Sequence, residues 1–118
     1  MNNGKYEYKN NSIVEDQGVK VNIKTGEIYS PPKFISIELT SRCNLDCSIC
    51  RYCHHKERGE ECGDMPLELF KLAVPFIKTS EQVFLSRTGE PLLAPNLMEC
   101  IRICREYPCN IAMASNGS

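Results

Sequence analysis

Several features are missing from this 118-residue chain, and each absence excludes a class of protein. No run of about 18 apolar residues occurs, which argues against a membrane-spanning helix. Residues 1–11 are polar and lack the apolar core of a secretion signal, so the cytoplasm is the expected compartment. The net charge is only -1, which offers no general basis for binding nucleic acid. What remains is an ordinary soluble protein, long enough for one small domain.

Cysteine is the residue type that the chain has in excess, with eight in all. Without a secretion signal, metal or cluster binding explains such a number better than a framework of disulfides. The distribution along the chain agrees with this interpretation. One group lies within twenty residues and the other sits apart: Cys43, Cys47, Cys50, Cys53 and Cys62 in the first, Cys100, Cys104 and Cys109 in the second.

The first third of the chain predicts little regular structure apart from one hairpin. Residues 1–17 are polar, and we expect them to be loosely ordered. Residues 18–33 predict a β-hairpin, in which the alternating strand 19–23 turns at 24–27 and returns at 28–29. Pro31 and Pro32 end it, because proline donates no ladder hydrogen bond.

From residue 34 onward, strands and helices alternate. The pattern predicts strands at 34–40, 82–86 and 110–115, and helices at 64–79 and 96–107. Asp64 and Asn96 are candidate N-caps, and Pro75 should kink the first helix. A β-α-β-α-β order implies parallel strands joined by right-handed crossovers. The expected fold class is therefore α/β: about three β/α units of a partial parallel barrel of TIM type, preceded by the hairpin.

Unusual residues follow each of the three predicted strands. The first strand leads into the cysteine loop, the second into Gly89-Glu90-Pro91, and the third into Ser115-Asn116-Gly117. Reactive groups of parallel α/β barrels lie on loops at the carboxyl ends of the strands. We therefore expect these loops to lie side by side and to form the functional site.

The spacing of Cys43, Cys47 and Cys50 suits an iron–sulfur cluster. Thiolates this close on one loop can bind three corners of an iron–sulfur cube. The fourth iron then has no protein ligand, and an open coordination position is typical of metal sites that perform chemistry.

The stretch Glu38–Cys50, with Thr40, Arg42, Asn44 and Leu45 around the first cysteine, closely resembles the cluster motif of the radical S-adenosylmethionine (radical SAM) enzymes. Gly89, Glu90 and Pro91 match that family's Gly-Glu-Pro motif after the second strand. Ser115 and Asn116 resemble the polar end of its third strand. The resemblance covers residues 34–118 and implies the incomplete core of such an enzyme.

The resemblance also implies cofactors and site residues. A [4Fe–4S] cluster would be held by Cys43, Cys47 and Cys50, and SAM would be bound by Gly89, Glu90, Pro91, Ser115 and Asn116. The reduced cluster would cleave SAM to methionine and a 5′-deoxyadenosyl radical, which would take a hydrogen atom from an unknown substrate. A reduced flavodoxin or ferredoxin would donate the electron.

The chain departs from the family pattern in two ways. Arg87 and Thr88 stand where the family has further glycine, and they narrow or displace the SAM site if the loop cannot adapt. The chain is also shorter than the roughly 250 residues of a complete barrel. It is therefore interpreted as a fragment of a longer enzyme or as a truncated, inactive product.

Other interpretations of the cysteines stay open. A non-catalytic module could bind zinc or a cluster; for zinc, Cys50 and Cys53 could act with Cys62, His54 or His55. Cys53 has no assigned role, and Cys62 is interpreted as an incidental thiol. Cys100 and Cys104 lie four residues apart on an apolar helix face, which favours buried packing, and Cys109 is interpreted in the same way.

Overall fold

The computed structural model describes residues 13–16, 19–22, 24–28, 30–50, 59 and 61–118. The chain divides into two compact units, Met1–Pro32 and Lys33–Ser118. Each unit is described by itself.

The first unit contains an antiparallel strand pair, β1 (Ile13–Asp16) and β2 (Val19–Asn22). The expected hairpin paired 19–23 with 28–29 instead; of this, the described residues show a single bridge between Val21 and Ile28. Residues 13–16, expected to be loosely ordered, are the main partner of β2. Ile23 and Tyr29 lie outside the described residues. Ile13 and Val14 were an apolar signal for β1 that the otherwise polar composition of residues 1–17 obscured.

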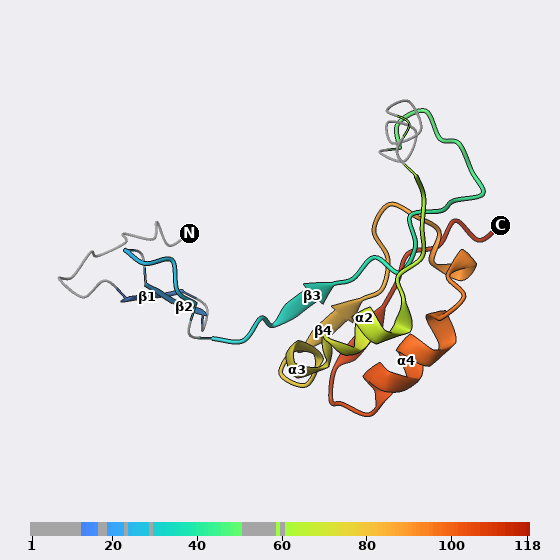
Figure 1. Cartoon of the computed structure of the whole chain (residues 1–118). Coiled ribbons are helices and arrows are strands. Elements are labelled where there is room, and N and C mark those ends of the chain that lie inside the picture. The colour runs from blue at the N-terminus through green and yellow to red at the C-terminus, as the bar shows by residue number, and fades with distance from the viewer. Residues whose placement is uncertain (1–12, 17–18, 23, 29, 51–58, 60) are drawn as a thin grey trace. The chain divides into compact units, whose positions relative to one another are not determined.

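The second unit is built on a three-stranded sheet with the predicted topology. Its strands stand in the order β3-β4-β5, and both pairs are parallel (Figure 1): β3 (Phe34–Ser36), β4 (Gln82–Phe84) and β5 (Asn110–Ala112). All three strands are shorter than the sequence predicts. Backbone pairing continues just beyond them, since Ile37 N donates to Phe84 O at 2.8 Å and Leu85 N to Ala112 O at 2.9 Å. After these bonds the strands separate into loops.

The predicted helix at 64–79 is two short helices, α2 (Leu67–Lys71) and α3 (Val74–Ile77). The expected kink at Pro75 is therefore a complete break. Proline lacks the N–H that would continue the helical bonds, and its ring clashes with the carbonyl four residues earlier. In the first turn of α3 neither matters, and Pro75 occupies that turn.

Both expected N-caps have other roles. The N-cap position of α2 is held by Pro66, and Asp64 instead pairs with Arg42. Asn96 does occupy the N-cap position of α4 (Leu97–Arg105), but its side-chain amide donates to Met65 O at 3.3 Å. A short 3-10 helix, η1 (Pro91–Leu93), precedes it and was not expected from the sequence. Each side chain found a partner in a neighbouring segment, which local sequence does not reveal.

The core lies between the sheet and the helices α2, α3 and α4, which cover one of its faces (Figure 1). Val83 sits at its centre, flanked in register by Ile35 and Ile111. The buried apolar residues are Leu39, Phe70, Ile77, Val83, Leu85, Ala94, Leu97, Cys100 and Cys104. Burial of this apolar surface is the main force that holds the unit together.

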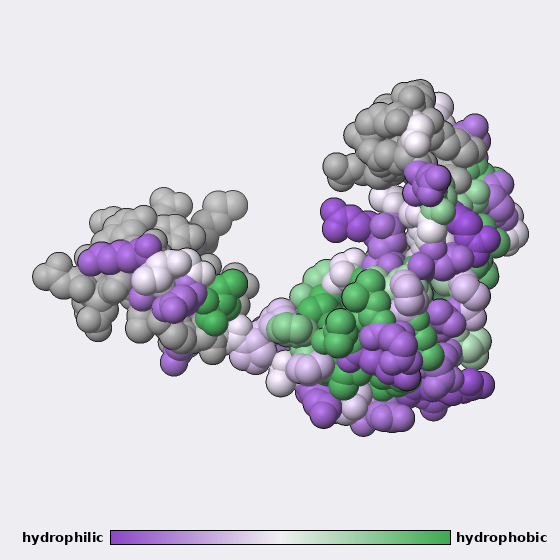
Figure 2. Space-filling view, viewed as in Figure 1, coloured by the Kyte–Doolittle hydropathy of each residue, from purple (hydrophilic) through white to green (hydrophobic). Residues whose placement is uncertain are grey.

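Some apolar side chains lie on the outer side of the helices. Figure 2 shows hydrophobic residues on the face that carries α2 and α3. The exposed large apolar side chains here are Leu69 of α2, Leu72 directly after it and Phe76 of α3. None of the helices in the described ranges has the length and apolar character needed to cross a membrane.

Candidate functional site

The three loops that follow β3, β4 and β5 meet at one end of the second unit, as predicted. We call this end the rim; it comprises residues 38–50, 86–93 and 113–118. Hydrogen bonds join its loops, some between two side chains, some between backbone groups and some between a side chain and the backbone. The following contacts link each loop to the other two.

Gly89 makes the closest approach between the first two loops. A Cβ atom at this position would lie 2.0 Å from Thr40 O and 2.8 Å from Arg42 O, so no other residue fits without moving the backbone. The next amide, Glu90 N, donates to Arg42 O at 2.8 Å. The glycine of the Gly-Glu-Pro motif is therefore required because two segments of the backbone pack directly against each other here.

Glu90 links the second loop to the third. Its side chain is only 3% exposed. Oε1 accepts from Ser115 Oγ at 2.8 Å and from Leu92 N at 3.1 Å, while Oε2 accepts from Asn116 N at 2.8 Å. Both carboxylate oxygens are thus used within the chain.

These bonds determine the ionisation of Glu90. Burial alone would raise the pKa of its carboxyl group, because a charge loses solvation inside a protein. The N–H of Asn116, the hydroxyl of Ser115 and the N–H of Leu92 outweigh burial and lower the pKa below its usual value. Glu90 is therefore a carboxylate at neutral pH.

Glu38, just after β3, supports the second loop, a role that the sequence did not reveal. Its Oε1 accepts from Thr88 N at 2.8 Å, from Gly89 N at 3.3 Å and from the hydroxyl of Thr88. Burial raises the pKa of Glu38, but the bonds from Thr88 and Gly89 together with Arg87 lower it overall. Thr88 thus contributes two donors where the family pattern has glycine, and the departure at this position has its own structural partner.

Asn116 returns from the third loop to the cysteine loop. Its side-chain Nδ2 donates to Asn44 Oδ1 at 2.9 Å and lies 3.8 Å from Cys43 Sγ as a donor to sulfur. Its Oδ1 accepts from the N–H and the hydroxyl of Ser118 at 3.0 and 2.9 Å, which orients the amide group. The predicted residues Ser115 and Asn116 therefore do lie beside Glu90 and Cys43.

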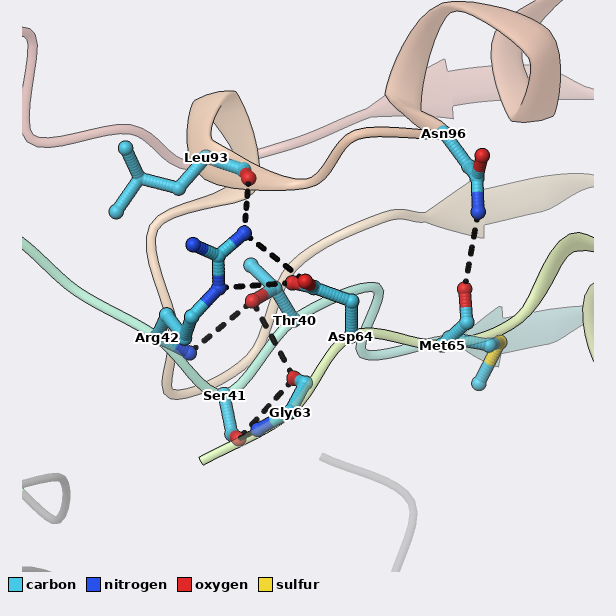
Figure 3. A network of polar contacts seen from close by, with 8 residues as sticks. All are labelled: Thr40, Ser41, Arg42, Gly63, Asp64, Met65, Leu93 and Asn96. Carbon is cyan, nitrogen blue, oxygen red and sulfur yellow. Dashed lines mark hydrogen bonds and ion pairs between the residues drawn. The ribbon is translucent and has the colours of Figure 1, made fainter. Parts of the chain in front are cut away.

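Arg42 joins the start of the cysteine loop to its end (Figure 3). Nε donates to Asp64 Oδ1 at 3.0 Å, Nη2 lies 2.9 Å from Oδ2, and Nη2 also donates to Leu93 O at 2.9 Å. The hydroxyl of Thr40 and the guanidinium of Arg42 lower the pKa of Asp64. The partners are 22 and 51 residues away, so no local sequence pattern could have predicted this network.

The three predicted ligand cysteines lie on the first loop of the rim. Cys43 and Cys50 are half-buried and Cys47 is exposed. Leu45 N donates to Cys43 Sγ at 3.5 Å, and Cys50 N donates to Cys47 O at 2.9 Å. In the described ranges, no three Cys, His, Asp or Glu side chains converge on a point that could hold a metal ion. The donor set itself fits a cluster: three thiols on one loop, with N–H donors at the first sulfur.

The cysteines of the second group have a different environment. Cys100 and Cys104 are 1% and 0% exposed, and burial raises the pKa of each thiol to about 11. The Cys109 thiol donates to Cys104 O at 3.5 Å. The prediction that Cys100 and Cys104 serve as packing residues is confirmed. Of the alternative zinc ligands, Cys62 is exposed, while Cys53, His54 and His55 lie outside the described residues.

Two curated proteins are similar in sequence to most of this chain. No family model matches the chain. The tungsten-containing aldehyde ferredoxin oxidoreductase cofactor-modifying protein of Pyrococcus furiosus is 32% identical over 89 residues, which cover 73% of this chain and 24% of that protein. An uncharacterized protein of Methanocaldococcus jannaschii is 29% identical over 93 residues, covering 78% of this chain and 28% of its own length.

The fold has a solved counterpart in BtrN, a radical SAM enzyme crystallised in complex with AdoMet and 2-DOIA. The two structures agree with a TM-score of 0.60 and 25% sequence identity, over 72% of this chain and 36% of BtrN. The parallel sheet, the motifs at its rim and these similarities relate the chain to the radical SAM enzymes. It spans about a quarter of the length of the curated relatives that it matches.

Proposed function

We propose that this chain holds a [4Fe–4S] cluster on Cys43, Cys47 and Cys50 and binds SAM beside it, as part of a radical SAM enzyme. When bound, the cluster would supply the electron for reductive cleavage of SAM. A flavodoxin or ferredoxin would reduce the cluster. The observation that carries the proposal is the meeting of the three motif-bearing loops at one rim, where Gly89, Glu90 and Asn116 surround the start of the cysteine loop.

The cysteine loop has suitable support for a cluster. Two N–H groups, Leu45 N and Asn116 Nδ2, donate to Cys43 Sγ at 3.5 and 3.8 Å. Hydrogen bonds to sulfur are among the factors that set the reduction potential of iron–sulfur clusters.

Within this proposal Glu90 acts by holding the SAM site in shape. Its two oxygens already accept three hydrogen bonds from the chain, so the carboxylate is committed to Leu92, Ser115 and Asn116. A buried carboxylate with these partners fixes the second and third loops against each other. The amino group of SAM would then meet a loop whose backbone is already fixed rather than a free carboxylate.

The experiment that tests the proposal is anaerobic reconstitution of the full chain with iron and sulfide, followed by electron paramagnetic resonance of the reduced protein with and without SAM. We expect a [4Fe–4S] signal that changes shape when SAM is added, because SAM would chelate the iron that has no protein ligand. The matched control is Cys104→Ala, which removes a thiol from the core and leaves the rim intact.

The two failures have different meanings. A cluster whose signal ignores SAM would leave a non-catalytic cluster module or an inactive product. A chain that takes up zinc but no cluster would support the alternative interpretation, a non-catalytic module that binds zinc.

A further inference from the structure

The two ends of the cysteine loop lie side by side where the loop leaves β3 and returns to α2. Ser41 N donates to Gly63 O at 2.9 Å, and Met65 N donates to Leu39 O at 2.8 Å. Gly63 N donates to Ser41 Oγ at 2.8 Å. These bonds close the base of the loop without involving the cysteines themselves.

Arg42 adds the contacts that fasten this closed base to the rest of the rim (Figure 3). Its guanidinium contacts both oxygens of Asp64, at the returning end of the loop, and also reaches Leu93 O at the end of η1. A planar guanidinium with five donors suits this combination of carboxylate and carbonyl, and an ammonium does not. One side chain therefore holds three segments.

The backbone of Arg42 contributes as well. Its carbonyl accepts from Glu90 N at 2.8 Å, and its N–H donates to Thr40 Oγ1 at 3.1 Å. Cys43 is the next residue along the chain. The position of the first cysteine relative to Gly89 and Glu90 thus depends on a residue that is anchored through both its main chain and its side chain.

Two other ion pairs of this unit give a useful contrast. Lys71–Glu68 and Arg102–Glu99 each join residues three apart in one helix, which the helix already holds together. Such exposed pairs contribute little to stability. Arg42 differs because its partners are 22 and 51 residues away in the chain and belong to two separate segments.

We propose that Arg42 is a positioning residue of the rim: paired with Asp64 and Leu93 O, it fixes Cys43 against the Gly89–Glu90 loop and so slows the loss of iron from the site. The cluster itself is the one in the proposed function, on which this inference rests. Arg42 acts through Cys43 and the loop base, without contact with the cofactor.

The test compares Arg42→Met, Arg42→Lys and the control Arg102→Met in the full chain. Amide hydrogen exchange is measured on the cluster-free protein, and iron release to a chelator on the reconstituted protein. In Arg42→Met we expect faster exchange at Ser41, Gly63 and Glu90, unchanged exchange at Val83 and Leu85, and iron release about tenfold faster or more. Arg42→Lys should give exchange and iron-release rates between those of the wild type and Arg42→Met, since it keeps the charge and loses the paired N–H donors of the guanidinium. Arg102→Met should match the wild type in both rates.

Two results overturn the inference. One is wild-type iron release from Arg42→Met; the other is faster exchange at Val83 and Leu85 as well, which would indicate a loss of overall stability instead of a local role. A wild-type chain that takes up no iron and sulfide would refute the proposed function instead. The exchange measurement would then decide alone whether Arg42 holds the loop base.

Discussion

The same residue type occurs in two opposite environments in this chain. Cys43, Cys47 and Cys50 lie on a polar loop, half-buried or exposed, with N–H donors at the first sulfur. Cys100 and Cys104 lie on the inner face of α4 and are almost fully buried. The first environment leaves the sulfur atoms near solvent, and the second suits a small apolar side chain.

The contrast extends to the regions around the two groups. The core between helices and sheet is held by apolar packing, which tolerates exchange of similar side chains. The rim is joined by hydrogen bonds, several of them to the buried Glu90 and the half-buried Glu38, where removing one partner leaves the other without compensation. Conservative substitutions should therefore cost more at the rim than in the core.

The largest expected effect is the complete loss of the cluster when Cys43, Cys47 or Cys50 is replaced singly by alanine. Two thiolates do not hold a cube that needs three. Iron and sulfide per chain, measured after anaerobic reconstitution, report the result, and Cys104→Ala should keep the wild-type content. Full iron content in Cys43→Ala would assign the cluster to another set of cysteines, with Cys53 the first to examine.

Gly89→Ala should be the most destabilising single substitution at the rim. The added Cβ would meet two backbone carbonyls, at 2.0 and 2.8 Å, and neither can move aside alone. We expect a loss of about 3 kcal/mol or more in the free energy of unfolding, measured by denaturant titration.

Gly63→Ala is the matched control for that experiment. It adds the same methyl group at a position where the new Cβ would have no atom of a non-adjacent residue within 4 Å, and it should change stability little. Equal stability of the two variants would contradict the close approach at Gly89.

Glu90→Gln should cost about 1–3 kcal/mol, because the amide nitrogen that replaces one oxygen cannot accept the hydrogen bond that this oxygen received. The loss should appear in denaturant unfolding at neutral pH. Glu99→Gln removes a half-exposed carboxylate that pairs with Arg102 in the same helix, and its effect should be much smaller. Similar losses in both variants would argue against a linking role for Glu90.

The stabilising contribution of Glu90 should also depend on pH. The pKa of Glu90 is lower in the folded chain than in the unfolded chain, where a glutamate titrates near about 4.3. Its stabilising contribution is therefore complete above about pH 4.3 and is lost as the pH falls through the folded pKa. The difference between wild type and Glu90→Gln should shrink below about pH 4, and a constant difference would be inconsistent with this linkage.

The smallest effect is one of rate. In the cluster-free protein at mildly alkaline pH, an alkylating reagent should modify the exposed Cys47 and Cys62 early and leave Cys100 and Cys104 unmodified until the chain unfolds. Their thiol pKa of about 11 keeps them protonated, and the core shields them. Mass spectrometry of a time course measures the order, and early modification of Cys104 would mean that the core opens readily.

Much of the rim could be predicted from the sequence because its residues come in short motifs. The spacing of Cys43, Cys47 and Cys50, the Gly89-Glu90 pair and the Ser115-Asn116 pair are each local signals. The alternation of strands and helices then brought their loops to one end of the sheet, since parallel strands share an orientation. The topology β3-β4-β5 confirmed that step.

The partners of individual polar side chains could not be predicted in this way. Asp64 was expected to cap a helix and instead binds Arg42, while Glu38 turned out to hold Thr88. Each of these contacts joins residues that are 22 or 50 positions apart. Propensities and periodicity report only on near neighbours, so they carry no information about such pairs.

Local chemistry along the chain thus sufficed for the class of fold, the location of the rim and the candidate ligands, because strand and helix patterns and short motifs act over a few residues. Folding was needed to assign Glu90 to Ser115 and Asn116, Arg42 to Asp64 and Leu93, and Gly89 to the carbonyls of Thr40 and Arg42. Those assignments depend on how closely separate segments approach one another. The tertiary structure sets that distance, because it brings together segments that are far apart in the chain.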